Sequence, residues 1–141
     1  METNGNEKIR IETIVNAPID KVWTCWTEPA HIVNWNQASD DWHSPNAKND
    51  LRALGKFSYR MESKDGKEGF DFWGTYDVVE PLKFISYTLG DDRKVEITFT
   101  EIGDQTGIVE VFEAEHVYPA EQQRLGWQSI LDNFKKYVEG Q

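Results

Sequence analysis

The most interesting local group of side chains that could carry acid–base chemistry is Asp40-Asp41-Trp42-His43. This run places two carboxylates, an aromatic ring and an imidazole side by side. General acid–base catalysis also requires burial to tune the pKa of such groups. The surrounding residues, 36–47, are rich in Asn, Ser, Asp and Pro, which favours an irregular, solvated loop. We therefore interpret the run as an acidic loop that could border the mouth of a site.

Glu113 and Glu115 form a second candidate pair, on a strand predicted over residues 108–117. Valines at alternate positions suggest an inward face that would include both carboxylates, and burial there would raise their pKa. Phe112 and Ala114 suggest the opposite inward face. A bulge near residue 112 would turn both glutamates toward solvent, and we favour that hypothesis.

Nucleophilic and metal-binding patterns are weak. Cys25 is the single cysteine, and because no histidine is placed locally to activate it, we predict that it packs in the core. His31, His43 and His116 lie at no metal-ligand spacing, which predicts no metal site. The sequence has no Gly-x-Ser-x-Gly motif and no Gly-rich phosphate loop. We therefore predict no cofactor and assign no catalytic residue.

Aromatic side chains are the stronger signal, with six Trp, seven Phe and five Tyr in 141 residues. Ligand sites are mostly apolar with a few polar groups, and a tyrosine hydroxyl can orient a ligand. The same rings could instead fill a solid core. The residues that we predict to bind a ligand are Trp35, Trp42, Phe57, Tyr59, Met61, Phe72, Tyr76, Tyr87, Ile97, Phe99, Trp127, Ile130 and Phe134.

The spacing of apolar residues predicts the elements that would bring these rings together. Residues 8–15 alternate with the period of a half-buried strand. Residues 18–27 and 29–35 show helical spacing and are separated by Glu28-Pro29, which predicts two short helices. Residues 120–139 carry one apolar stripe and predict a single long helix.

Between these helices the period changes to two and predicts about six antiparallel strands. Asp65-Gly66 predicts a hairpin turn between two of them. The strand that follows is expected to place Val78 on the same face as Tyr76, with Gly74 marking a bulge or a bend.

This order of elements predicts an α+β fold, in which a curved antiparallel sheet wraps around a long C-terminal helix. A helix laid across a curled sheet leaves a gap unless large side chains fill it. The rings either fill this gap under residues 120–139 or line a cavity there, and the spacing alone leaves both hypotheses open. The length predicts one domain over residues 1–141, of which the polar residues 1–6 are expected to be disordered.

Charge and hydropathy exclude several classes of partner. A net charge of −10 disfavours binding to nucleic acid or to an anionic membrane surface, since both require a basic surface. No apolar run approaches the ~20 residues of a membrane helix, and the first residues do not resemble a signal peptide. With one cysteine and no internal disulfide, the expected location is the cytoplasm. We expect no stable membrane association, and a protein partner remains open.

Several stretches, in the right order, match the pattern of one known family: Val15-Asn16-Ala17-Pro18, Lys21-Val22-Trp23, Thr27-Glu28-Pro29, Trp35, Leu51-Arg52, Phe57, Tyr59-Arg60-Met61, Phe72-Trp73-Gly74-Thr75-Tyr76 and Gly126 to Phe134. On these stretches the chain resembles, over about residues 8–139, the family named after the activator of the heat-shock-protein-90 ATPase. That family belongs to the SRPBCC or helix-grip superfamily, together with START lipid-transfer domains, birch-pollen-allergen-like proteins and aromatic polyketide cyclases.

The resemblance implies a seven-stranded antiparallel sheet that grips the C-terminal helix, with a cavity for an apolar small molecule between them. Our first interpretation is a binding or carrier protein for a hydrophobic molecule, aromatic or lipid-like, rather than an enzyme. One alternative is an enzyme of the polyketide cyclase or hydrolase type, which would require an Asp, Glu or His inside the cavity. Another alternative is a module that acts on a chaperone.

Overall fold

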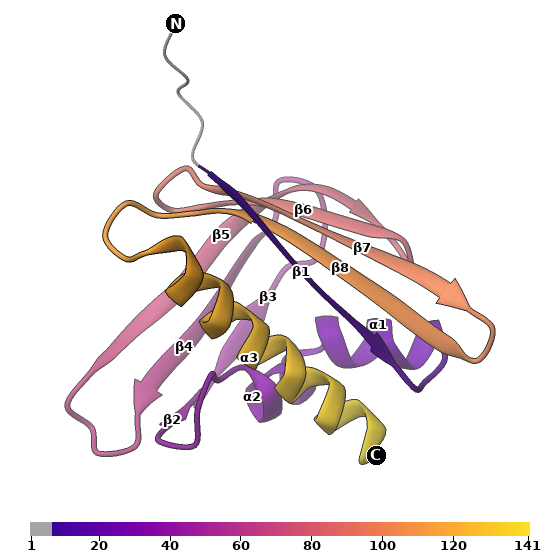
Figure 1. The fold of residues 1–141 in the computed structure, drawn as a ribbon, viewed down its shortest axis with the longest axis horizontal. Helices are drawn as coiled ribbons and strands as arrows, with labels where there is room; N and C mark the ends of the chain where they lie inside the picture. The colour runs from indigo at the N-terminus through magenta and orange to yellow at the C-terminus, as the bar shows by residue number, and fades with distance from the viewer. Residues whose placement is uncertain (1–6) are drawn as a thin grey trace, which may run out of the picture.

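The computed structural model describes residues 7–141, and the segment predicted to be disordered, residues 1–6, lies outside the described residues. Within the described part, eight strands form one curved antiparallel sheet, and the long C-terminal helix lies along its concave face (Figure 1). Two short helices follow the first strand and cover one end of the same face. The α+β helix-grip fold predicted from the sequence is therefore confirmed.

The elements follow in the order β1 (Lys8–Val15), α1 (Ile19–Thr27), α2 (Pro29–Trp35), β2 (Trp42–His43), β3 (Ala47–Asn49), β4 (Lys56–Ser63), β5 (Gly69–Glu80), β6 (Phe84–Leu89), β7 (Lys94–Ile102), β8 (Gln105–Glu113) and α3 (Ala120–Glu139). The strands are arranged as β1-β8-β7-β6-β5-β4-β2, and β3 also pairs with β4. The segment predicted as irregular over residues 36–47 thus contains β2 and the start of β3. Both strands are too short to show a period of two.

The two short helices meet at Glu28, where Pro29 begins α2 because its fixed backbone suits a first helical turn. The indole Nε1 of Trp35 donates a hydrogen bond to the backbone oxygen of Cys25 at 3.0 Å. This bond joins α1 to α2 in the core. Cys25 itself is buried, which agrees with the packing role expected for it, and burial raises the pKa of its thiol.

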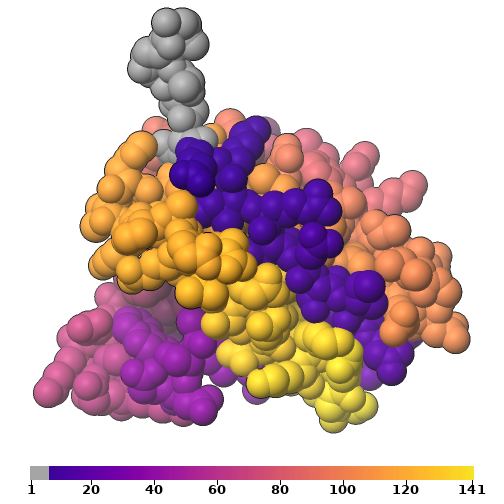
Figure 2. Space-filling model, viewed as in Figure 1, coloured from indigo at the N-terminus to yellow at the C-terminus, as the bar shows by residue number. Residues whose placement is uncertain are grey.

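The C-terminal helix α3 has the predicted bounds, and its far end is fastened to β1. The Nζ of Lys135 donates to the backbone oxygen of Ile14 at 2.6 Å, and the carboxylate of Glu139 accepts a bond from the backbone N–H of Asn16 at 2.8 Å. The space-filling view shows α3 between β1 on one side and the segment around β2 on the other (Figure 2). Among residues 7–141, no helix combines the length and apolar character that crossing a membrane requires.

Strand β5 departs from the prediction at its bulge. The register with β6 shifts between Tyr76 and Val78, not at Gly74. The shift leaves Val78 41% exposed and packs Val79 against the core instead, which corrects the predicted inward position of Val78. Gly74 serves close packing, because a Cβ there would lie 2.7 Å from the backbone oxygen of Thr88.

Strand β8 corrects the prediction for residues 108–117. It runs from Gln105 to Glu113, and its pairing with both β1 and β7 is unbroken, so the proposed bulge near residue 112 is absent from this part of the chain. The inward side chains are those at even positions, including Ile108, Glu110 and Phe112. Glu113 therefore turns outward, and Glu110 is the carboxylate that points toward the core.

Candidate functional site

A cavity of about 170 Å³ lies between the sheet and the first half of α3. Strands β4, β5, β6 and β8 form its floor, and α3 covers it. Eight of the thirteen predicted ligand-binding residues lie in its wall: Trp35, Tyr59, Met61, Phe72, Tyr76, Tyr87, Trp127 and Ile130. These residues come from five separate elements that only the folded sheet brings together.

The predicted residues outside the wall are Trp42, Phe57, Ile97, Phe99 and Phe134. Phe57 lies behind the wall, with its ring centroid 4.7 Å from that of Tyr87. Phe99 and Phe134 pack against the ring of Trp26, at centroid distances of 5.6 and 4.8 Å. These side chains support the wall from behind.

Further wall residues that the sequence analysis did not select are Trp26, Asn36, Phe70, Ile85, Glu110 and Leu131. Phe70 and Ile85 share the inward alternation of their strands, and Leu131 belongs to the apolar stripe of α3, so the same signals could have found them. Glu110 could have been found from Phe112, because both lie at even positions and therefore on the same face of β8. Asn36 had no sequence signal, because its position depends on how α2 ends.

Glu110 is the one carboxyl group in the wall of this cavity. Its residue is 6% exposed, and its neighbours in register on β1 and β7 are Ile11 and Ile97, which carry no charge. Burial raises the pKa of Glu110 from 4.5 to about 8, with no cation to oppose the shift. The group is therefore mostly a neutral carboxylic acid at pH 7, able to donate a hydrogen bond.

Three tyrosines of the wall are also neutral donors. Burial raises the pKa of Tyr76 to about 12, and it raises the pKa values of Tyr59 and Tyr87 well above the usual range. The hydroxyl of Tyr76 donates to Oδ1 of Asn49 at 2.5 Å. Asn49 in turn donates from Nδ2 to the backbone oxygen of Thr27 at 2.7 Å, which ties the wall to α1.

Asn36 follows the last residue of α2 and is 6% exposed. It lies in the cavity wall, and its Nδ2 has no hydrogen-bond partner among residues 7–141. A buried amide hydrogen without a partner is costly to leave unpaired. Together with Glu110, it gives an otherwise aromatic cavity two polar positions.

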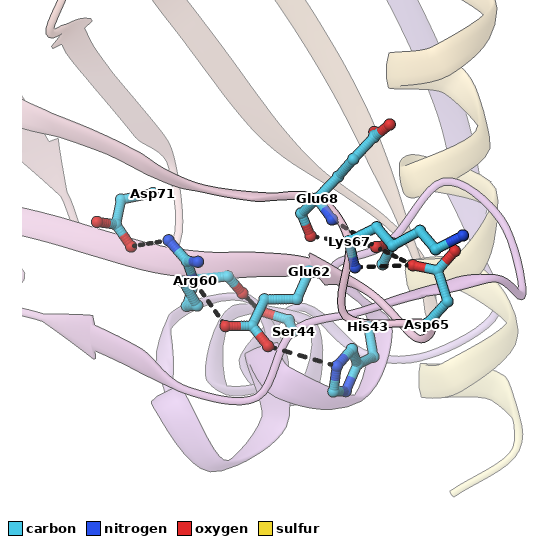
Figure 3. A network of polar contacts seen from close by, with 9 residues as sticks. His43, Ser44, Arg60, Glu62, Asp65, Lys67, Glu68 and Asp71 are labelled. Atoms are coloured by element: carbon cyan, nitrogen blue, oxygen red, sulfur yellow. Dashed lines mark hydrogen bonds and ion pairs between the residues drawn. The ribbon is translucent and has the colours of Figure 1, made fainter.

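The acidic loop around Asp40 lies elsewhere. His43 points toward Glu62 on β4, with 3.8 Å between its Nε2 and the carboxylate, and both side chains are substantially exposed (Figure 3). Glu62 also accepts a bond from Nε of Arg60 at 2.8 Å, and Arg60 reaches Asp71 at 3.5 Å. The imidazole thus belongs to a surface network of charges.

Trp42, in the same loop, lies beside the cavity wall. Its ring centroid lies 6.0 Å from that of Phe70, which is itself a wall residue.

Within residues 7–141, no three side chains of the metal-ligating types are grouped so that they could hold an ion.

Comparison with known proteins places this chain and its fold in a family. The model of the family described as "Activator of Hsp90 ATPase homolog 1-like protein" matches residues 16–139. The chain therefore belongs to this AHSA1-like family, which has the helix-grip fold of the SRPBCC superfamily.

Solved structures agree with this assignment. The AHSA1-like protein from Aeromonas hydrophila is 42% identical, with a TM-score of 0.90, over 95% of this chain and 93% of that one. A protein from Cytophaga hutchinsonii is 53% identical, with a TM-score of 0.82, over 94% and 92%. A protein from Chromobacterium violaceum shares the fold at 22% identity and a TM-score of 0.82, over 94% and 98%. The comparison with curated proteins gives no match.

Proposed function

We propose that this protein binds a small hydrophobic molecule, aromatic or lipid-like, in the cavity between the sheet and α3. The observation that carries the proposal is a cavity walled by aromatic rings with a few polar groups among them, which is the usual composition of a ligand site. We also expect the protein to work in the cytoplasm, where the buried thiol of Cys25 would stay reduced.

The cavity volume sets the scale of the ligand. About 170 Å³ is close to the volume of an engineered cavity of about 150 Å³ that holds benzene. A molecule with one ring therefore fits with the side chains in place. A larger molecule would require Trp127 and Ile130 to move, and both are only half-buried.

A second candidate function is an enzyme acting on such a molecule, and Glu110 is the observation that favours it. An enzyme was expected to need a titratable group inside the cavity, and Glu110 is one. A neutral carboxylic acid in an apolar site can transfer a proton to a bound carbonyl group. Action on a chaperone, or on any other protein partner, stays a prediction.

A ligand titration tests the proposed binding. Single-ring aromatics, flavonoids, fatty acids and polyketides are titrated, with tryptophan fluorescence and amide and indole chemical shifts as readouts. We expect shifts at the indole N–H of Trp127 and at Tyr87. Shifts confined to the outer sheet face, around the exposed Trp73, would contradict the proposal.

Two variants of α3 make a matched pair for this titration. Ile130→Trp places a larger ring in the cavity and should abolish binding of ligands that wild type holds. Leu125→Trp makes the same kind of change on the same helix at a site that is 53% exposed, and it should leave binding unchanged. If both variants bound the ligand equally well, the cavity would not be the binding site.

A further inference from the structure

Two polar side chains of the cavity wall, in addition to its three tyrosines, share an unusual state. Glu110 and Asn36 are each 6% exposed, and both lie in the cavity wall. The Nδ2 of Asn36 lacks a partner among residues 7–141, and burial is the only influence on the Glu110 carboxyl, with no hydrogen bond to it. Buried polar groups are normally paired within the protein or with a bound molecule. The cavity therefore presents two donors that a ligand can pair.

The groups that share the cavity wall with Glu110 carry no positive charge. From β4, β5 and β6 they include the phenols of Tyr59, Tyr76 and Tyr87, and from α3 they include Trp127 and its apolar neighbours. No Lys, Arg or His contributes to the wall. Arg93, beyond the end of β6, acts on Tyr87 and not on Glu110. The carboxyl therefore keeps its proton at neutral pH and can donate it in a hydrogen bond.

We propose that the ligand is a small uncharged aromatic carbonyl compound, an aryl ketone or aldehyde, whose oxygen accepts a hydrogen bond from the Glu110 carboxyl. The proposal rests on the proposed function, because it names the ligand class of the same cavity. Asn36 supplies a further donor from the wall. Glu110 acts here as a recognition residue.

A carbonyl group fits these donors better than other polar groups do. Its oxygen has two lone pairs and accepts hydrogen bonds without bringing a donor of its own. A protonated amine has only donors, so it would leave the Asn36 amide unpaired. A carboxylate would bring a second buried negative charge beside Glu110.

The first test compares three one-ring probes on the full chain at pH 6: acetophenone, α-methylstyrene and benzylamine. α-Methylstyrene has the shape of acetophenone with a methylene group in place of the oxygen. A hydrogen bond to a buried donor is worth about 1–1.5 kcal/mol, so acetophenone should bind about tenfold more tightly than α-methylstyrene. Tightest binding by benzylamine, lost in Glu110→Gln, would overturn the proposal in favour of an amine site.

Variants of Glu110 test whether the hydrogen bond that this side chain donates, or only the shape of the cavity, determines which probe binds. Glu110→Gln keeps a donor and should bind acetophenone within about threefold of wild type. Glu110→Leu removes the donor and should abolish the tenfold preference, so that acetophenone and α-methylstyrene bind equally tightly to this variant. The preference of wild type should fall as the pH rises past 8, because an ionised carboxyl has no proton to donate, whereas Glu110→Gln should show a flat profile.

Infrared spectroscopy gives a readout that needs no variant. The carbonyl stretch of ¹³C-labelled acetophenone should move to lower frequency in the wild-type complex at pH 6 and return toward its apolar-solvent value above pH 8. Equal binding of acetophenone and α-methylstyrene would overturn the role of Glu110 and leave the cavity as a binding site. Failure of all three probes would overturn this ligand class, and the wider titration above then decides the proposed function separately.

Discussion

The two halves of α3 carry the same apolar stripe but lie over different surroundings. Toward its C-terminus, Leu131, Phe134 and Val138 are almost completely buried. The ring of Phe134 meets those of Trp26 and Trp35 edge to face, at 4.8 and 4.9 Å. This end of the gap between helix and sheet is filled.

Toward its N-terminus, the same stripe covers the cavity. Trp127 stacks on Phe112 at 3.9 Å, yet its contact with Phe72 is a looser one at 5.9 Å, and Ile130 is only half-buried. The difference arises from the opposing elements. The indoles of Trp26 and Trp35, from α1 and α2, pack against Phe134 at the filled end, whereas strands β4, β5, β6 and β8 supply most of the wall at the hollow end.

The largest expected effect concerns the carboxyl at the hollow end. The folded state holds a proton on Glu110 up to about pH 8 that the unfolded chain releases near pH 4.5, so raising the pH favours unfolding between these values. Wild type should match Glu110→Gln near pH 4 and be less stable by up to roughly 5 kcal/mol at pH 9. Urea denaturation across this range measures the difference. If the difference in unfolding free energy between wild type and Glu110→Gln does not change with pH, water or a cation reaches the carboxyl.

The next effect compares ring deletions at the two ends. Phe134→Ala should lower the free energy of unfolding by about 3–5 kcal/mol, because it opens a cavity in a filled cluster. Phe72→Ala should cost roughly 1–2 kcal/mol, because its half-buried ring already borders empty space. Denaturant unfolding of both variants at one pH gives the comparison. Equal losses would mean that the two ends are packed alike.

The smallest effect comes from adding bulk. Val138→Phe should destabilise the fold by about 1–3 kcal/mol, because Val138 is 0% exposed and has no space beside it. Ile130→Trp adds more atoms but places them in the cavity, so its unfolding free energy should stay within about 1 kcal/mol of wild type. Thermal unfolding distinguishes these outcomes, and greater damage from Ile130→Trp would contradict a hollow end.

Much of the fold could be predicted from the sequence because long amphipathic periods encode it locally. The bounds of α3 followed from one apolar stripe, and Pro29 marked the division between α1 and α2. Val78 was misplaced because a bulge reverses the alternation after Tyr76. The bulge depends on pairing with β6, and no residue type at that point of the sequence indicates it.

The site was less predictable, since it depends on pairing between distant segments. The inward face of β8 is set by its register with β1 and β7, so the valines at odd positions gave the wrong face. The correct face carries Glu110, and a glutamate inside an apolar core runs against the usual pattern of burial. Asn36 could not be predicted for a similar reason, because only the packing of α2 against the sheet brings it to the cavity.

The pairing of β1 with β8 also constrains how the chain acquires its structure. Lys8 lies opposite Glu113, so β1 has no neighbour in the sheet until residues 105–113 have been synthesised. The helix that covers the concave face comes later still. Contacts between such remote segments slow folding and keep apolar surface uncovered meanwhile. We therefore expect this fold to form in one late, cooperative step, with its many indole and phenyl rings exposed to chaperones until that step.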